Sequence, residues 1–141
     1  MTLIAKSGIV SLASKLPPEQ TRFGTGLIVG EDIQAGDACY VKTVDGLVYR
    51  SLGATAGADA ARVDGFAAMD SKVAQSDAVT LFRDVDFRYG VGFFAGSLVG
   101  KRVYLSASVA GGLDSAVTVG GVGPIGVIID DTRIRLTPSG Y

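Results

Sequence analysis

The sequence predicts an all-β fold: a small β-barrel, or a β-tulip or sandwich, built from two repeated strand-turn units. Three observations favour this class. Apolar and polar residues alternate through residues 79–93, which is the period of a strand with one buried face. The chain has 20 glycines in 141 residues without a collagen period, as is typical of short strands joined by tight turns. A pattern in residues 35–68 returns in residues 99–129.

Residues 1–25 differ from the rest of the chain and are predicted to form an extended N-terminal arm. Their apolar residues are irregularly spaced, and Gly8, Pro17 and Pro18 interrupt any regular element. A helix over residues 5–16 is the alternative interpretation, which Gly8 and the β-branched residues Ile9 and Val10 disfavour.

Residues 26–141 are predicted to form a single β-barrel domain that contains the internal repeat. In the two copies, Gly36 aligns with Gly100 and Tyr40 aligns with Tyr104. A glycine-leucine pair and a later glycine before an apolar run also return. These positions are Gly46 and Leu47 with Gly112 and Leu113, and Gly65 with Gly126. Neither copy is large enough to close a core alone, so the two are expected to pack on each other with pseudo-twofold symmetry.

Alternation along the two aligned strands assigns their side chains to faces. Tyr40 and Tyr104 are expected to point outward, where an exposed aromatic side chain is a candidate contact residue. The residues expected to point inward are Cys39, Val41, Val103 and Leu105.

The alternating residues 79–93 are predicted to be a half-buried strand or hairpin. Their apolar residues share one parity that only Arg83 breaks, while Asp84, Asp86 and Arg88 take the solvated face. Residues 125–129 and 133–136 are predicted to be two short strands joined by a tight turn at Asp130. A helical turn is expected only in residues 57–62.

Composition argues against several classes of partner and location. A formal net charge of -1 gives no basis for binding nucleic acid. No apolar stretch approaches the roughly 20 residues that a membrane helix needs. The single cysteine, Cys39, excludes an intramolecular disulfide. The first residues lack the pattern of a secretory signal, so synthesis in a cytoplasm is expected.

No catalytic, metal-binding or cofactor-binding residue is predicted, and the chain is expected not to be an enzyme. Histidine is absent, which removes the commonest general base and metal ligand. Cys39 is expected to be a buried structural thiol, and Asp84 and Asp86 part of a solvated strand. Residues 121–126 have the glycine spacing of a dinucleotide-binding turn, but the β-branched residues after them predict a strand where that site requires a helix.

Several motifs of the two copies are familiar when taken together. They are the turn at residues 35–37, residues 40–41, 45–49 and 63–67, the alanine-rich loop between them, and residues 103–107, 111–113 and 125–129. In these motifs the chain resembles the capsid decoration or cement proteins of tailed bacteriophages. The resemblance covers roughly residues 26–136.

This resemblance implies a β-barrel or tulip-like body bound outside the assembled, expanded head, often as a homotrimer. The partners would be the major capsid protein and further copies of the chain. The protein would be made in the host bacterial cytoplasm and reside on the capsid exterior of the virion. In that role the arm would lie across a neighbour or add a strand to a sheet edge. The candidate capsid or neighbour contacts are Leu3, Ile4, Ile9, Val10, Leu12, Leu16, Arg22 and Phe23.

Two other functions stay open at this point. A tail or fibre-associated β module that binds a host surface glycan would need exposed aromatics beside carboxylates, and this chain has no tryptophan. A small β-barrel hydrolase or ligand-binding domain would need a concave pocket with convergent polar groups.

Overall fold

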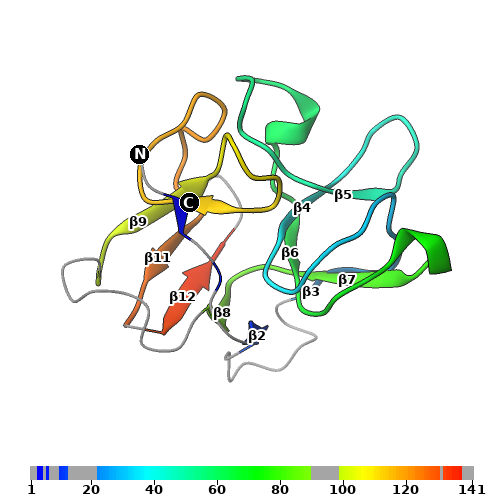
Figure 1. Ribbon diagram of the computed structural model, residues 1–141, viewed down its shortest axis with the longest axis horizontal. Helices are drawn as coiled ribbons and strands as arrows, with labels where there is room; N and C mark the ends of the chain where they lie inside the picture. The colour runs from blue at the N-terminus through cyan, green and yellow to red at the C-terminus, as the bar shows by residue number, and fades with distance from the viewer. Residues whose placement is uncertain are drawn as a thin grey trace.

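The chain folds as an all-β protein, which confirms the predicted class. The computed structural model describes residues 3, 4, 6, 10–12, 22–89, 99–130 and 132–137. Their strands form antiparallel sheets of seven and five strands, which occupy the left and right halves of Figure 1. Helical structure in these residues consists of the 3-10 turns Asp59–Ala61 and Val73–Gln75, the first of which lies inside the predicted helical turn.

Apart from the N-terminal strands β1 (Leu3–Ile4) and β2 (Ser11–Leu12), the strands divide into two units of identical topology. The first unit contains β3 (Arg22–Ile28), β4 (Ala38–Val41), β5 (Val48–Arg50), β6 (Gly65–Ala67) and β7 (Ala78–Phe82). The second contains β8 (Val85–Arg88), β9 (Arg102–Leu105), β10 (Leu113–Asp114), β11 (Gly126–Ile128) and β12 (Arg133–Leu136). Their strand orders, β3-β7-β6-β4-β5 and β8-β12-β11-β9-β10, correspond one to one.

Strand register is also the same in the two units. Cys39 lies opposite Gly65 in the first unit, and Val103 lies opposite Gly126 in the second. In the structure, the repeat takes the form of two units with the same strand order and register. It is also longer than the sequence indicated, because β3 and β7 correspond to β8 and β12, whose sequences share no motif.

One aligned pair of the predicted repeat is wrong by a single residue. The carbonyls of Leu47 and Gly112 accept equivalent hydrogen bonds across their hairpins, at 2.9 and 3.0 Å. Gly46 therefore corresponds to Gly111. Both have a left-handed backbone, with φ of 72° and 77°, because the tight turn into β5 or β10 requires it.

The first unit curls around its core without closing a continuous barrel. Directly after β3, Val29 forms an isolated parallel bridge with Val48 of β5, and the Gly30 N–H donates to the Val48 carbonyl at 2.8 Å. A single bridge joins the two edges of the sheet. The two sheets together form a sandwich-like body, so of the predicted architectures the closed barrel is the one not observed.

The alternating segment from residue 79 onward forms neither one strand nor a hairpin. β7 ends at Phe82 in the five-stranded sheet, and β8 begins at Val85 in the seven-stranded sheet. Asp84, which lies between them, has a left-handed φ of 58° that redirects the chain. The predicted apolar parity is buried on both sides of this break, as at Leu81 and Phe87, but Phe82 and Asp86 of the other parity are buried as well, so the solvated face predicted for Asp86 is wrong.

Two apolar cores hold these sheets together, and the first unit contributes to both. Adjacent residues of one strand, such as Phe66 and Ala67, belong to different cores because their side chains point to opposite faces. The smaller core lies within the first unit. The larger core combines Ala38, Phe66 and Phe82 with the apolar face of the second unit. The five-stranded sheet is therefore buried on both faces, which explains its nearly continuous apolar strands.

Candidate functional site

The N-terminal segment, predicted to be a contact arm, is built into the body of the protein. β1 pairs with β10 at one edge of the seven-stranded sheet, and β2 pairs with β8 at the other. Ile4 of β1 and Val10, directly before β2, are buried in the larger core. The Lys6 ammonium forms an ion pair with the buried Asp37 carboxylate. This segment therefore contributes to folding as well as to any contact with a partner.

The predicted contact residues divide into buried, exposed and undescribed ones. The prediction that Ile4 and Val10 are contact residues is wrong, because their side chains are buried in the larger core. Leu3 is 39% exposed on β1 and stays a candidate contact. Leu12 lies in β2 opposite Phe87. Arg22 and Phe23 lie in β3, so the predicted end of the arm at residue 25 falls inside a strand. Ile9 and Leu16 are outside the described residues.

Tyr40 is not exposed, contrary to the prediction, although Tyr104 is half-buried. The Tyr49 ring packs 6.1 Å from the Tyr40 ring, centroid to centroid, and the Arg62 guanidinium lies 5.8 Å from the Tyr40 ring centroid. Of the four residues expected to point inward, Cys39, Val103 and Leu105 are buried and Val41 is half-buried against the smaller core.

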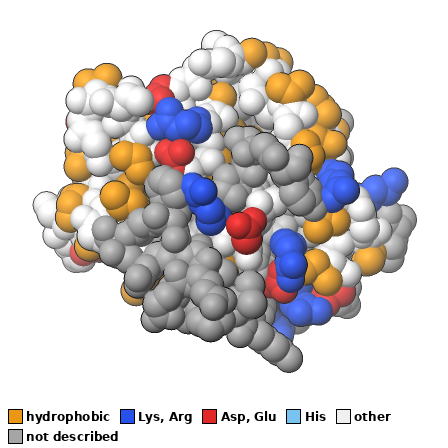
Figure 2. Space-filling view, turned by 180° about the vertical axis from the view of Figure 1, so that it is seen from behind, with side chains coloured by type: hydrophobic (Ala, Val, Ile, Leu, Met, Phe, Trp, Pro, Cys, Tyr) orange, Lys and Arg blue, Asp and Glu red, His pale blue; other side chains and the backbone are white. Residues whose placement is uncertain are grey.

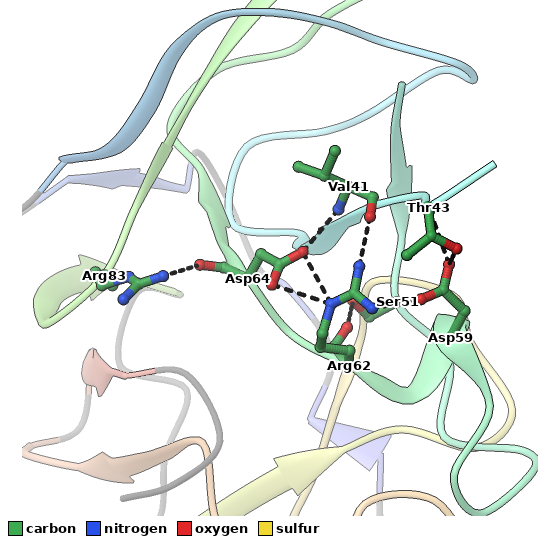
Figure 3. Close-up of polar contacts among 7 residues, drawn as sticks. All are labelled: Val41, Thr43, Ser51, Asp59, Arg62, Asp64 and Arg83. Atoms are coloured by element: carbon green, nitrogen blue, oxygen red, sulfur yellow. Dashed lines mark hydrogen bonds and ion pairs between the residues drawn. The ribbon is translucent and has the colours of Figure 1, made fainter. Parts of the chain in front are cut away.

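Arg62 is fixed over Tyr40 by a network of polar contacts (Figure 3). Its guanidinium donates to both Asp64 carboxylate oxygens at 3.1 and 3.2 Å, to Asp59 and to the Val41 carbonyl. Asp64 in turn accepts the Val41 N–H at 2.8 Å. These contacts join β4 to the loop before β6.

An exposed sheet face on the second unit is the main feature that sequence reasoning missed. Arg102, Val127, Arg135 and Asp86 lie opposite one another across β9, β11, β12 and β8, so their side chains share one face. Arg133 and Arg88 form the next pair along the same strands. We call Arg88, Arg102, Val127, Arg133 and Arg135 the outer face. The alternation of arginine with apolar residues in β12 was its only signal in the sequence.

The charges of the outer face are partly balanced. Arg135 contacts Asp86 through Nε at 2.7 Å, and Arg133 contacts Asp130 at 2.7 Å. Among the described residues of this face, the four arginines Arg88, Arg102, Arg133 and Arg135 outnumber Asp86 and Asp130. On the back of the molecule, charged side chains of both signs alternate in a band between hydrophobic patches (Figure 2).

In the first unit, the surface that corresponds to the outer face is buried. The register places Ala38, Phe66 and Phe82 where the second unit has Arg102, Val127 and Arg135. Those three first-unit residues lie in the larger core, together with apolar residues of the second unit. The same sheet surface is therefore a packing interface in one unit and exposed in the other.

The surroundings of the titratable groups singled out in the sequence, Cys39 and Asp130, indicate roles in folding. Burial raises the pKa of the Cys39 thiol well above its usual value, and its Sγ lies 3.4 Å from the Asp37 carbonyl. Asp130 accepts the Thr132 and Arg133 N–H groups at 3.0 and 2.8 Å, as the predicted turn requires. Its hydrogen bond with the Arg133 side chain is the main cause that lowers the Asp130 pKa to about 2.

The glycine pattern at residues 121–126 leads into strand β11 and not into a helix, so its geometry is not that of a dinucleotide-binding turn. No group of three or more histidine, cysteine, aspartate or glutamate residues in the described part of the chain is arranged to hold a metal ion. In the same part of the chain, no helix has the length and apolar character needed to span a membrane. Comparison with protein-family models, curated proteins and solved structures gives no match.

Proposed function

We propose that this chain is a capsid decoration, or cement, protein of a tailed bacteriophage. It binds the outside of the assembled, expanded head and stabilises it through contacts that bridge capsid subunits. Its partners are the major capsid protein and copies of itself, as a homotrimer on the virion exterior. The sequence resemblance over residues 26–136 supports this family, and the duplicated all-β body is compatible with it.

The outer face of the second unit is the observation that carries the proposal. Its counterpart in the first unit is an interface, because there the same strands pack against the next unit of the chain. A repeated unit that docks head to tail leaves one such surface without its partner at the end of the array. In this chain that surface carries arginines, which suits an acidic capsid surface better than another apolar unit.

Leu3 extends the same argument to the N-terminal segment. β1 is the terminal strand of the seven-stranded sheet, and Leu3 is its exposed side chain. An extended strand of a neighbouring capsid subunit can add to such an edge through main-chain hydrogen bonds. Contacts at the outer face and at β1 would let one molecule hold two capsid subunits. The assembled shell gains stability by mass action, since only that shell presents both.

Co-sedimentation with expanded phage heads that lack the protein tests the proposal, with unexpanded procapsids as the control. We expect saturable binding to expanded heads at a fixed copy number and weak binding to procapsids. Arg102→Glu reverses a charge on the outer face and is expected to weaken binding about tenfold, in a salt-dependent way.

Lys72→Glu is the matched control, since it makes the same change of charge at an exposed residue of the first unit. It should bind like the unmodified protein. Failure of the unmodified protein to bind either particle contradicts the proposed function. Equal binding by the two variants contradicts the role of the outer face.

A further inference from the structure

Two loops that occupy the same place in the repeat form one end of the molecule. Residues 51–58 follow β5 and residues 115–125 follow β10, and neither range contains an aspartate, glutamate, lysine or arginine. The loops are in contact, because the Gly120 N–H donates to the Gly53 carbonyl at 2.7 Å. Both lie at the top of Figure 1. The surface that these loops contribute is therefore uncharged.

The second loop exposes three valines, and its anchoring explains why. The Thr118 hydroxyl donates to a backbone carbonyl of β9 at 2.7 Å and accepts the Gly121 N–H at 2.9 Å, so the Thr118 side chain faces the body. Successive side chains of an extended chain point to opposite sides, so the residues on either side of Thr118 face solvent. The exposed fractions of Val117, Val119 and Val122 are 50, 65 and 68%.

A hollow next to this turn is lined by both loops, through Gly57 and Ala58 of the first and Gly120 of the second. Two charged residues line it as well, but the Asp59 carboxylate pairs with the Arg62 guanidinium. This end of the molecule thus combines an exposed valine-rich turn with a hollow in which the two opposite charges are paired. A cluster of exposed apolar side chains on one loop marks an interaction surface.

We propose that further copies of this chain cover Val117, Val119 and Val122, so that the uncharged ends of the copies meet around the symmetry axis of the homotrimer. This inference deepens the proposed function and rests on its homotrimer. The contact removes exposed valine surface from water, which favours association. It uses the second loop as the contact element and leaves the outer face free for the capsid.

The absence of charge is what selects a second copy as the occupant. Near a symmetry axis each residue lies close to the same residue of the next copy, so a charged side chain there would face its own like. Valine, alanine and glycine avoid that repulsion. A partner of different sequence can instead offer opposite charges, and the arginines of the outer face suit such a partner. The two surfaces therefore differ in the chemistry of the partner that fits them.

Sedimentation equilibrium of the purified protein and its variants tests the contact. We expect the unmodified protein to form a trimer, and Val119→Lys and Val122→Lys each to weaken association about a hundredfold, because like charges would meet at the axis. Val73→Lys is the matched control. It makes the same change at a 43% exposed valine on the 3-10 turn Val73–Gln75, and it should associate like the unmodified protein. Urea unfolding shows that each variant still folds.

An unmodified protein that stays monomeric at millimolar concentration overturns the proposal, and so does a trimer that both lysine variants leave intact. A lysine variant that stays trimeric but no longer co-sediments with expanded heads assigns the valines to the capsid, which overturns it as well. Capsid binding by the unmodified protein is measured separately. If heads are not bound but the lysine variants dissociate the trimer, the proposed function fails and the contact between copies stands.

Discussion

Ile4 and Leu3 are neighbours on β1 that test whether the N-terminal segment belongs to the core. Ile4 is 4% exposed and packs in the larger core, whereas Leu3 is 39% exposed. Replacing either residue by alanine removes three carbon atoms from the same strand. The pair therefore differs in burial and little else.

The expected cost of Ile4→Ala follows from the buried atoms. At about 0.8 kcal/mol for each buried methylene, three carbon atoms account for about 2.4 kcal/mol of the free energy of unfolding. The cavity left behind raises this to about 3 kcal/mol. Leu3→Ala is expected to cost about 1 kcal/mol or less, because its side chain already contacts water. A loss of 3 kcal/mol is a large fraction of the 5–15 kcal/mol that is usual for a single domain.

Urea unfolding followed by circular dichroism measures both variants, and an unchanged m-value shows that the two-state comparison is valid. The same proteins are then tested for co-sedimentation with expanded heads. We expect Leu3→Ala to be nearly as stable as the unmodified protein but weaker in attachment. Equally small losses of stability in both variants would refute the packing of β1 in the core and restore the interpretation of residues 1–25 as a free arm.

Two further predictions concern the repeat and its last turn. Gly65→Ala and Gly126→Ala should each lower the free energy of unfolding by about 1–3 kcal/mol, because an added Cβ would lie 2.8 Å from the Leu81 Cβ or 2.5 Å from the Arg135 carbonyl oxygen. Gly123→Ala, which meets nothing within 4 Å, should be neutral in the same denaturation assay, and a cost there equal to the others would contradict the steric reason. Asp130→Asn should cost about 1 kcal/mol at pH 7. The Asp130 pKa is lowered to about 2, so its contribution is present above about pH 4 and disappears as the pH falls toward 2. The free energies of unfolding of Asp130→Asn and of the unmodified protein should therefore differ at pH 7 and become equal near pH 2. The same difference at both pH values would show that the carboxylate charge is not the cause.

The sequence predicted the fold class and the repeat because both depend on local patterns. The alternation of apolar and polar residues predicted the strands, and the glycine positions predicted the turns between them. The full extent of the repeat was not predictable, because β3 and β8 correspond only in their place in the sheets. The exposed outward direction assigned to Tyr40 was wrong because Tyr49 and Arg62, from other strands and loops, cover its ring.

The candidate site was predictable only in part. An irregular run of apolar residues correctly marked the N-terminal segment as distinct, but such a run does not tell a surface contact from a core contact. Ile4 and Val10 pack in the larger core, so they are core residues and not surface contacts. The outer face was missed because Arg88, Arg102, Val127, Arg133 and Arg135 come from four strands, and only the sheet order brings them together.

The most direct test of the proposed function is the temperature at which expanded phage heads without this protein break open, measured by calorimetry at increasing concentrations of the protein. If the chain cements the shell, this temperature rises with the concentration of free protein, and Arg102→Glu requires a higher concentration than Lys72→Glu for the same rise. A transition temperature that stays constant while the protein is bound would contradict a stabilising role, and one that stays constant because nothing binds would contradict the capsid as partner.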